Sequence, residues 1–263
     1  MRMHKTLAEL GLTAYATAVI AFLLIPVAIV IPMSLTDSLV FEVVPSRLSL
    51  SQYFRLFSNA AWMEVLGRSI QVATAVMFAA TALGTLAAMG IMRLTGAPGA
   101  FAEALFIAPQ IVPSVVIAVS SYYVFSRSGL VGTTLGIVIA HTLIALPFVV
   151  VLVRSRLQSL DPDLTLASAS LGASPAQTFF RITVPQLRIT LFGAGILAFH
   201  VSFDEVVLAL FLTGARNKTL PVKLWDSILF EVTPILPAIS TVVIAIPILI
   251  VAAIALLRRW ARQ

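Results

Sequence analysis

Two adjacent carboxylates, Asp204 and Glu205, are the residues best placed to do chemistry, because they interrupt the apolar stretch HVSFDEVVLALFLTG at residues 200–214. An ionised carboxylate inside a bilayer costs at least a few kcal/mol unless it faces water or a partner. Helical spacing predicts that Asp204 shares a face with His200 and that Glu205 shares one with Val201 and Leu208. Two interpretations stay open: one carboxylate lines a cavity while the other pairs with a neighbouring helix, or His200 and Asp204 pair with each other or hold a partner chain.

No catalytic motif accompanies these carboxylates. The sequence has no phosphate-binding Gly-x-x-x-x-Gly-Lys-Ser/Thr loop, no His-Glu-x-x-His and no Gly-x-Ser-x-Gly, so we expect no catalytic residue and no ATP hydrolysis by this chain. His4, His141 and His200 are too scattered to predict a metal site, and the absence of cysteine excludes disulfides and thiolate chemistry. The close pair Gly193 and Gly195 is typical of helix packing in a membrane. The sequence therefore predicts a protein that is not an enzyme.

The composition predicts an integral membrane protein. Hydrophobic residues make up 60% of the 263 residues and charged residues only 11%, with a mean hydropathy of +1.05, whereas a soluble surface needs about a quarter charged residues. Charge-free or nearly charge-free segments long enough to cross a bilayer recur along the chain. They predict an all-α fold with six transmembrane helices, near residues 12–33, 69–92, 101–125, 132–153, 189–213 and 236–257.

The third of these segments contains two prolines, Pro109 and Pro113, in the sequence APQIVPS. Because proline lacks an amide hydrogen and clashes with the preceding turn, we expect this span to be kinked or locally opened. Such kinks occur both in helices that move during transport and in helices that only bend around a neighbour. The sequence leaves both explanations open.

The charge distribution predicts the orientation. With six spans, ten of the 17 Lys and Arg residues fall on the side of the two termini, which is therefore expected to be cytoplasmic. The first span is expected to remain an uncleaved helix and not a secretory signal peptide. The net charge of +6 is attributed to topology and to anionic lipid headgroups, so membrane lipid is an expected partner and nucleic acid is not.

The loop LASASLGASPAQTFFRITVP at residues 166–185 resembles the coupling loop of permease subunits in bacterial binding-protein-dependent ABC importers. In that family two short helices meet at the glycine and insert into a groove on the ATPase subunit. The resemblance implies a cytoplasmic coupling loop at residues 156–187, within a single permease domain over residues 1–263. The family usually has a glutamate where this chain has Leu166. The matching positions are Ala167, Ser168, Leu171, Gly172, Ala173, Phe179, Val184 and Pro185.

The C-terminal part, including residues 202–214 and TLPVKLWD at residues 219–226, resembles the second permease subunit of spermidine/putrescine importers. The resemblance implies a type I ABC importer permease fold in the bacterial inner membrane. It also implies a second permease subunit, two ATPase subunits that carry ATP and Mg, and a periplasmic substrate-binding protein. The substrate pathway is then expected to include His200, Phe203, Asp204 and Glu205.

The substrate class stays open among related possibilities. A small cationic solute such as spermidine or putrescine is favoured by the two carboxylates, while an opine, an amino-acid derivative or 2-aminoethylphosphonate is the alternative within the same importer class. A secondary transporter or channel, in which Asp204 and Glu205 bind a coupling ion, is the alternative from another class. No inverted internal repeat is visible in the sequence.

Overall fold

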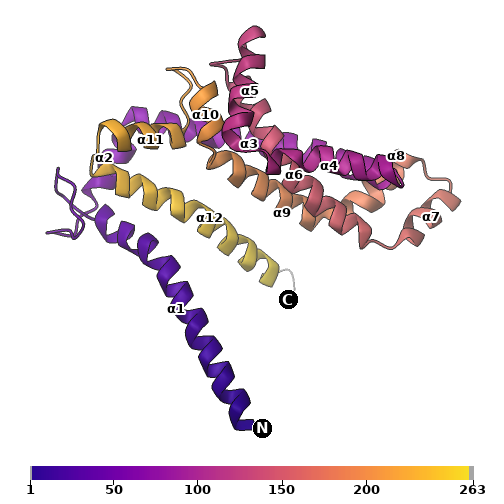
Figure 1. The fold of residues 1–263 in the computed structure, drawn as a ribbon, viewed down its shortest axis with the longest axis horizontal. Coiled ribbons are helices and arrows are strands. Elements are labelled where there is room, and N and C mark those ends of the chain that lie inside the picture. The colour runs from indigo at the N-terminus through magenta and orange to yellow at the C-terminus, as the bar shows by residue number, and fades with distance from the viewer. Residues whose placement is uncertain (1, 261–263) are drawn as a thin grey trace. The chain divides into compact units, whose positions relative to one another are not determined.

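The computed structural model describes the backbone of residues 2–260 and the side chains of residues 11–161, 163, 164 and 166–248. The predicted cytoplasmic C-terminus, with Arg262 and Gln263, lies outside the described residues. The described chain is all-α, as predicted, and its helices are labelled in Figure 1. They are α1 (Arg2–Ser34), α2 (Ser51–Ser58), α3 (Ala60–Met92), α4 (Ala97–Ile111), α5 (Ser114–Arg127), α6 (Thr134–Gln158), α7 (Pro162–Ser170), α8 (Pro175–Thr178), a π-helical turn (Phe179–Thr183), α9 (Val184–Phe203), α10 (Val207–Leu212), α11 (Leu220–Phe230) and α12 (Ile235–Trp260).

Among the described residues, four helical segments are long and apolar enough to cross a bilayer: Gly11–Ser34, Ala60–Met92, Thr134–Gln158 and Pro175–Phe203. The consecutive helices α4 and α5 make a fifth if the pair is one broken span. In α12 the apolar part with described side chains, Ile235–Ile248, is shorter than a full span. Six spans are compatible with this arrangement and stay a prediction.

The chain divides into two compact units, residues 1–63 with 226–263, and residues 64–225. In the first unit α12 packs against α1 and α2. Between α1 and α2 the loop is closed by a bridge between Thr36 and Leu48 and by the Gln52 amide, which donates to the Ser38 carbonyl at 2.7 Å. In this loop the backbone N–H of Ser46 donates a hydrogen bond to the Glu42 carboxylate. This bond stabilises the ionised form and lowers the pKa of Glu42. The single permease domain stays a prediction.

In the second unit α6 lies against both α4 and α9, which run alongside it in Figure 1. Small residues allow helices to approach closely in membrane proteins. At Gly84 in α3, an added Cβ would lie 2.6 Å from Cγ1 of Val149 in α6, so that only glycine fits this crossing. The buried core around α6 is formed by aliphatic side chains and alanines of five helices.

The third predicted span is broken at the second of its two prolines, Pro113, whereas Pro109 lies inside α4. The sequence predicted a kinked or locally opened span. Helix α4 ends at Ile111, α5 begins at Ser114, and the two helices are bent by 102°. Pro113 cannot donate a backbone hydrogen bond, and its extended ψ of 134° directs the chain away from the axis of α4. The bend opens the backbone between two otherwise apolar helices.

The fifth predicted span is also broken, and the prediction of one continuous helix over residues 189–213 is wrong. Helix α9 ends at Phe203 with Asp204 as its C-terminal cap, and α10 begins at Val207. The Glu205 carboxylate accepts the backbone N–H of Leu208 at 2.9 Å, which satisfies a free donor in the first turn of α10. A side chain that caps a new helix stabilises the break, and apolar periodicity gives no sign of it.

Candidate functional site

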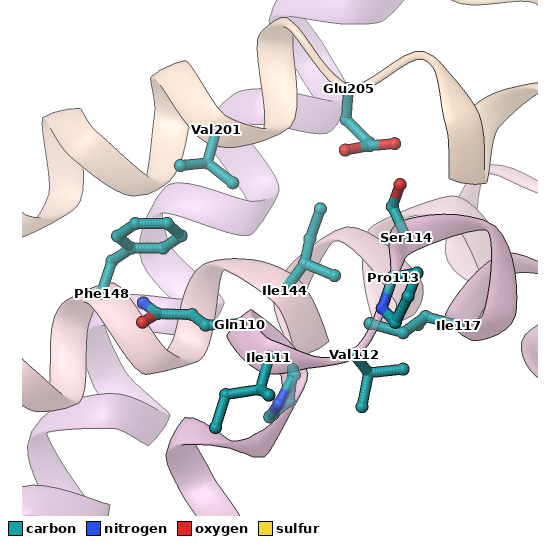
Figure 2. Close-up of a pocket in the computed structure, with 11 residues that line it drawn as sticks. Gln110, Ile111, Val112, Pro113, Ser114, Ile117, Ile144, Phe148, Val201 and Glu205 are labelled. Atoms are coloured by element: carbon teal, nitrogen blue, oxygen red, sulfur yellow. The ribbon is translucent and has the colours of Figure 1, made fainter.

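A pocket of about 610 Å³ lies where the α4–α5 bend meets the break between α9 and α10. Two residues from the middle of α6, Ile144 and Phe148, also line it. Figure 2 shows the lining side chains, most of which are apolar, with the Glu205 carboxylate directed into the same space as the Ser114 hydroxyl. The lining residues are Pro109, Gln110, Ile111, Val112, Pro113, Ser114, Ile117, Ile144, Phe148, Val201 and Glu205.

Glu205 is the one charged side chain of this lining. It is half-buried, and its Oε1 accepts the Leu208 N–H at 2.9 Å. Its Oε2 accepts no hydrogen bond from the part of the chain that the structure describes. In Figure 2 the Ser114 hydroxyl lies next to the carboxylate, whereas the neutral Gln110 amide lies beside the Phe148 ring, away from Glu205. The pocket can therefore offer one carboxylate oxygen, a hydroxyl and an amide to a small ligand with a positive charge.

The other residues predicted for the pathway lie elsewhere. Asp204 and His200 are exposed, and neither lines the pocket. Phe203 is 5% exposed and stacks on Phe199 with ring centroids 5.6 Å apart, so it belongs to the core. Glu205 and Val201 were predicted to share a helical face, and both line the pocket. Leu208, which was predicted for the same face, is instead buried in the core.

Of the lining residues, the sequence predicted only Glu205 for the pathway and missed, among others, the polar Gln110 and Ser114 and the aromatic Phe148. Gln110 and Ser114 each directly follow one of the two prolines that predicted the bend, and the available signal was that polar side chains occur at an expected helix break. Irregular backbone at membrane depth is tolerated only where it is buried in protein or lines a cavity. No sequence signal distinguished Phe148 from the other aromatic residues of the spans.

The second candidate site is the turn between α7 and α8. The backbone N–H groups of Gly172 and Ala173 donate to the carbonyls of Ala169 and Ser168, each at 3.0 Å. This pair of bonds is the Schellman motif, which requires a left-handed residue directly after the helix cap. Gly172 fills that position with φ = 80°, a conformation that costs other residues free energy. The short helix α7 therefore ends at the predicted glycine, whereas the helix that follows it, α8, continues through the π-helical turn into α9 and is not a separate short helix.

The two arms of the turn are tied together by a buried hydrogen bond. The Ser168 and Thr178 hydroxyl oxygens are 2.6 Å apart, and Ser174 and Gln177 form a reciprocal capping box at the start of α8. Apolar side chains point away from this scaffold: Leu166 is 65% exposed and Leu171 88% exposed. Such exposed leucines on a rigid turn suit an interface with another protein.

The remaining predicted loop residues lie along the same segment. Ala167 is exposed on α7, and Ala173 follows the glycine. Phe179 begins the π-helical turn, in which the N–H of Val184 donates to the Phe179 carbonyl. The Phe179 ring contacts the Phe180 ring edge to face, with the ring centroids 4.8 Å apart. Pro185 stands exposed in the first turn of α9. These predicted residues thus follow one another along α7, the glycine turn, the π-helical turn and the first turn of α9.

An ion pair lies between the two sites. Arg154, near the C-terminal end of α6, donates to the carboxylate of Glu103 on α4. Helix α4 leads to the pocket lining, whereas α6 leads toward α7 and the turn. Among the described residues, no group of three or more His, Cys, Asp or Glu side chains could hold a metal ion.

Comparisons with known proteins agree with this architecture. The putrescine transport system permease protein PotI of Escherichia coli (strain K12) is 32% identical over 199 residues, which are 73% of this chain and 71% of PotI. The spermidine/putrescine transport system permease protein PotC of the same organism is 28% identical over 245 residues, 93% of this chain and 92% of PotC. A chain from the crystal structure of a bacterial ABC transporter involved in the import of the acidic polysaccharide alginate has the same fold. It superimposes with a TM-score of 0.70 at 14% identity, covering 97% of this chain and 95% of that one.

A family model, described as binding-protein-dependent transport system inner membrane component, matches residues 80–262. These residues include α4 to α10, and with them both the pocket and the glycine turn. The chain therefore belongs to the family of inner membrane permeases of binding-protein-dependent transport systems.

Proposed function

We propose that this chain forms half of the translocation pathway for a small polyamine, such as putrescine or spermidine, in an ABC importer. The observation that carries the substrate class is the Glu205 carboxylate, which faces an otherwise uncharged pocket. The names of the relatives PotI and PotC, which refer to putrescine and spermidine, support the same class.

The pocket chemistry favours a cation. An ammonium group close to the Glu205 carboxylate would gain Coulomb energy that water screens less in a cavity than in bulk. The Gln110 and Ser114 oxygens can accept hydrogen bonds from the same or a second ammonium group, and the Phe148 ring can contribute a cation–π contact. The phosphonate group of 2-aminoethylphosphonate would instead be repelled by Glu205, so that only its ammonium group could approach the carboxylate. We therefore place the substrate-pathway role on Glu205 and not on Asp204.

Coupling to ATP hydrolysis is assigned to residues 156–187. The exposed Leu166 and Leu171 would contact an ATPase subunit, which carries ATP and Mg. The turn connects through α8 and the π-helical turn to α9, whose 20 residues extend about 30 Å and end beside the pocket. Movement of the turn would therefore displace the break that carries Glu205. Alternating access results when this displacement opens the pocket first to one side of the membrane and then to the other.

The remaining subunits follow from this assignment. The full importer would contain a second permease, two ATPase subunits and a periplasmic substrate-binding protein, with both termini of this chain in the cytoplasm. The binding protein would dock on residues 37–68 and 213–236. The guanidinium of Arg68 donates to the Arg216 carbonyl and to Asn217 Oδ1, each at 2.5 Å, which supports an ordered surface at residues 213–219.

The test compares Glu205→Gln with Asp204→Asn in the reconstituted importer. Removing a charged partner of an ammonium group costs about 1.5–3 kcal/mol, so Glu205→Gln should lower uptake of radiolabelled spermidine and putrescine by roughly 10- to 100-fold. The Asp204→Asn variant should retain uptake, because Asp204 lies outside the pocket. Uptake of 2-aminoethylphosphonate is measured beside the polyamines.

Three results would overturn parts of the proposal. Wild-type uptake by Glu205→Gln removes the pathway role of this residue. Transport of the phosphonate alone removes the polyamine assignment and leaves the importer function intact. Uptake that continues without ATP or the ATPase subunits would indicate a secondary transporter or channel.

A further inference from the structure

Two hydrogen bonds hold the broken fifth span, one on each side of the break: the first is to α6 and the second is to the loop that precedes α6. On the α9 side, His141 Nδ1 and Ser202 Oγ are 2.9 Å apart. On the α10 side, the backbone N–H of Gly132 donates to the Leu212 carbonyl at 2.8 Å. Glu205 lies between these two points, so its position relative to α6 is determined by how firmly each of them is held.

The bond to Ser202 is fully enclosed. His141 is 0% exposed and Ser202 is 4% exposed. The second ring nitrogen of His141, Nε2, has no hydrogen-bond partner among the described residues. The imidazole therefore keeps one directional contact in an apolar core, and losing that contact would leave a buried polar group without any partner.

His141 also stands in line with the pocket. Ile144 and Phe148, which follow it by three and seven positions on α6, share its helical face, and both line the pocket with Glu205. Ser202 precedes Glu205 by three residues and lies in the last turn of α9. The bond thus joins the pocket-lining face of α6 to the end of the helix from which Glu205 departs.

We propose that His141 is a positioning residue for the cation site, acting through Ser202 to hold the Glu205 carboxylate in the pocket. This inference rests on the proposed function of Glu205. Without the bond, the last turn of α9 can shift along α6, and the carboxylate then occupies its place beside Ser114 for only part of the time. A ligand that requires the carboxylate at this position then binds more weakly, because its apparent affinity falls in proportion to the fraction of time for which the carboxylate occupies the position.

A purely structural role makes a different prediction. If the bond only stabilises the core, its removal lowers the thermal stability of the complex and leaves the affinity for cations unchanged. If it positions Glu205, its removal weakens cation binding, and this weakening disappears when Glu205 is already neutral. The two roles are therefore separable by a double-mutant cycle.

The experiment measures the Kd of radiolabelled spermidine for the detergent-solubilised permease–ATPase complex without binding protein. Ser202→Ala removes the partner with little change of volume and should weaken binding about five-fold, the effect of about 1 kcal/mol. His141→Leu should weaken it similarly. His141→Asn, whose amide reaches the depth of Nδ1, should keep the bond and bind within roughly two-fold of wild type.

Thr142→Val is the matched control, because the Thr142 hydroxyl is also buried but donates at 2.7 Å to Val138 of its own helix. It should leave the Kd unchanged. In the Glu205→Gln background, Ser202→Ala should cause no further weakening.

An unchanged Kd in Ser202→Ala overturns the inference, whether or not His141→Leu assembles. If Glu205→Gln weakens binding and Ser202→Ala does not, only the positioning role fails. If Glu205→Gln has no effect while Ser202→Ala weakens binding, both the proposed function and this inference fail.

Discussion

Replacing Gly172 tests whether the turn between α7 and α8 transmits force. Gly172 has φ = 80°, and a Cβ built on it meets no other atom within 4 Å. The cost of a substitution is therefore conformational and not steric. A left-handed conformation costs an ordinary residue about 1–2 kcal/mol, and a β-branched residue more, whereas Asn tolerates it best.

These costs predict a rank order. A loss of 1–2 kcal/mol reduces the population of the correct turn by about 5- to 30-fold relative to the alternatives. Coupling should therefore decline in the order Gly172, Gly172→Asn, Gly172→Ala and Gly172→Val. The assay is ATP hydrolysis by the reconstituted importer, stimulated by the loaded binding protein, with assembly checked by co-purification of the ATPase.

Gly129 supplies the matched control, since it also has positive φ, at 68°, and free space around its Cβ, but lies between α5 and α6. Gly129→Val should strain the backbone by a similar amount without reducing ATPase stimulation. Normal stimulation in Gly172→Val, or an equal loss in Gly129→Val, would refute the coupling assignment.

Three further predictions concern the loop, the packing and the topology. Ser168→Ala leaves the buried Thr178 hydroxyl without its 2.6 Å partner and should lower the free energy of unfolding by about 1–3 kcal/mol, measured by thermal unfolding. The double variant Ser168→Ala with Thr178→Val should recover part of this loss. Gly84→Ala forces a Cβ against Val149 and should cost about 1–3 kcal/mol of stability by the same measurement. Adding Val149→Ala to this variant should restore part of the lost stability. If the losses of the two single variants simply add in the double variant, the packing argument is contradicted. Ser174→Cys, in a chain without natural cysteine, should react with an impermeant thiol reagent only after permeabilisation, and labelling of intact cells would contradict a cytoplasmic loop.

The four long apolar helices, and the bent pair α4–α5, were predictable because hydrocarbon imposes a length and excludes unpaired charge. Their ends were less so. Helix α3 begins at Ala60, well before the predicted start at Ser69, because the Asn59 side-chain oxygen accepts the backbone N–H groups of Ala61 and Trp62. Within this first part of the helix, Glu64 and Arg68 form an ion pair at 2.7 Å one turn apart. Charges that neutralise each other along a helix do not end it.

The break at Asp204 was not predictable from apolar periodicity. It contains neither proline nor glycine, and it is stabilised by a hydrogen bond from Leu208 to the Glu205 side chain. The sequence did indicate that two carboxylates in a span need an explanation, but not that only Glu205 would line the pocket. That distinction depends on residues from four helices that meet only in the folded chain.

The turn at Gly172 was the most predictable part of the candidate sites. Its geometry is local, since the Schellman bonds and the capping box join residues within five positions of one another. The Ser168–Thr178 bond, in contrast, required the two arms to fold back on each other. Local sequence predicts the turn, and tertiary structure supplies its rigidity.

The π-helical turn at Phe179–Thr183 has a consequence for how this loop can be inherited or exchanged. Such a turn contains one residue more than the α-helical repeat, which rotates the preceding segment by about 100° relative to α9. Deleting one residue there would let the turn relax to a regular α-helix and rotate Leu166 and Leu171 away from their present direction. A loop grafted here from another permease would therefore keep the direction of its exposed leucines only if the number of residues between Pro175 and Pro185 is preserved. We expect insertions and deletions in this segment to be tolerated less well than point substitutions.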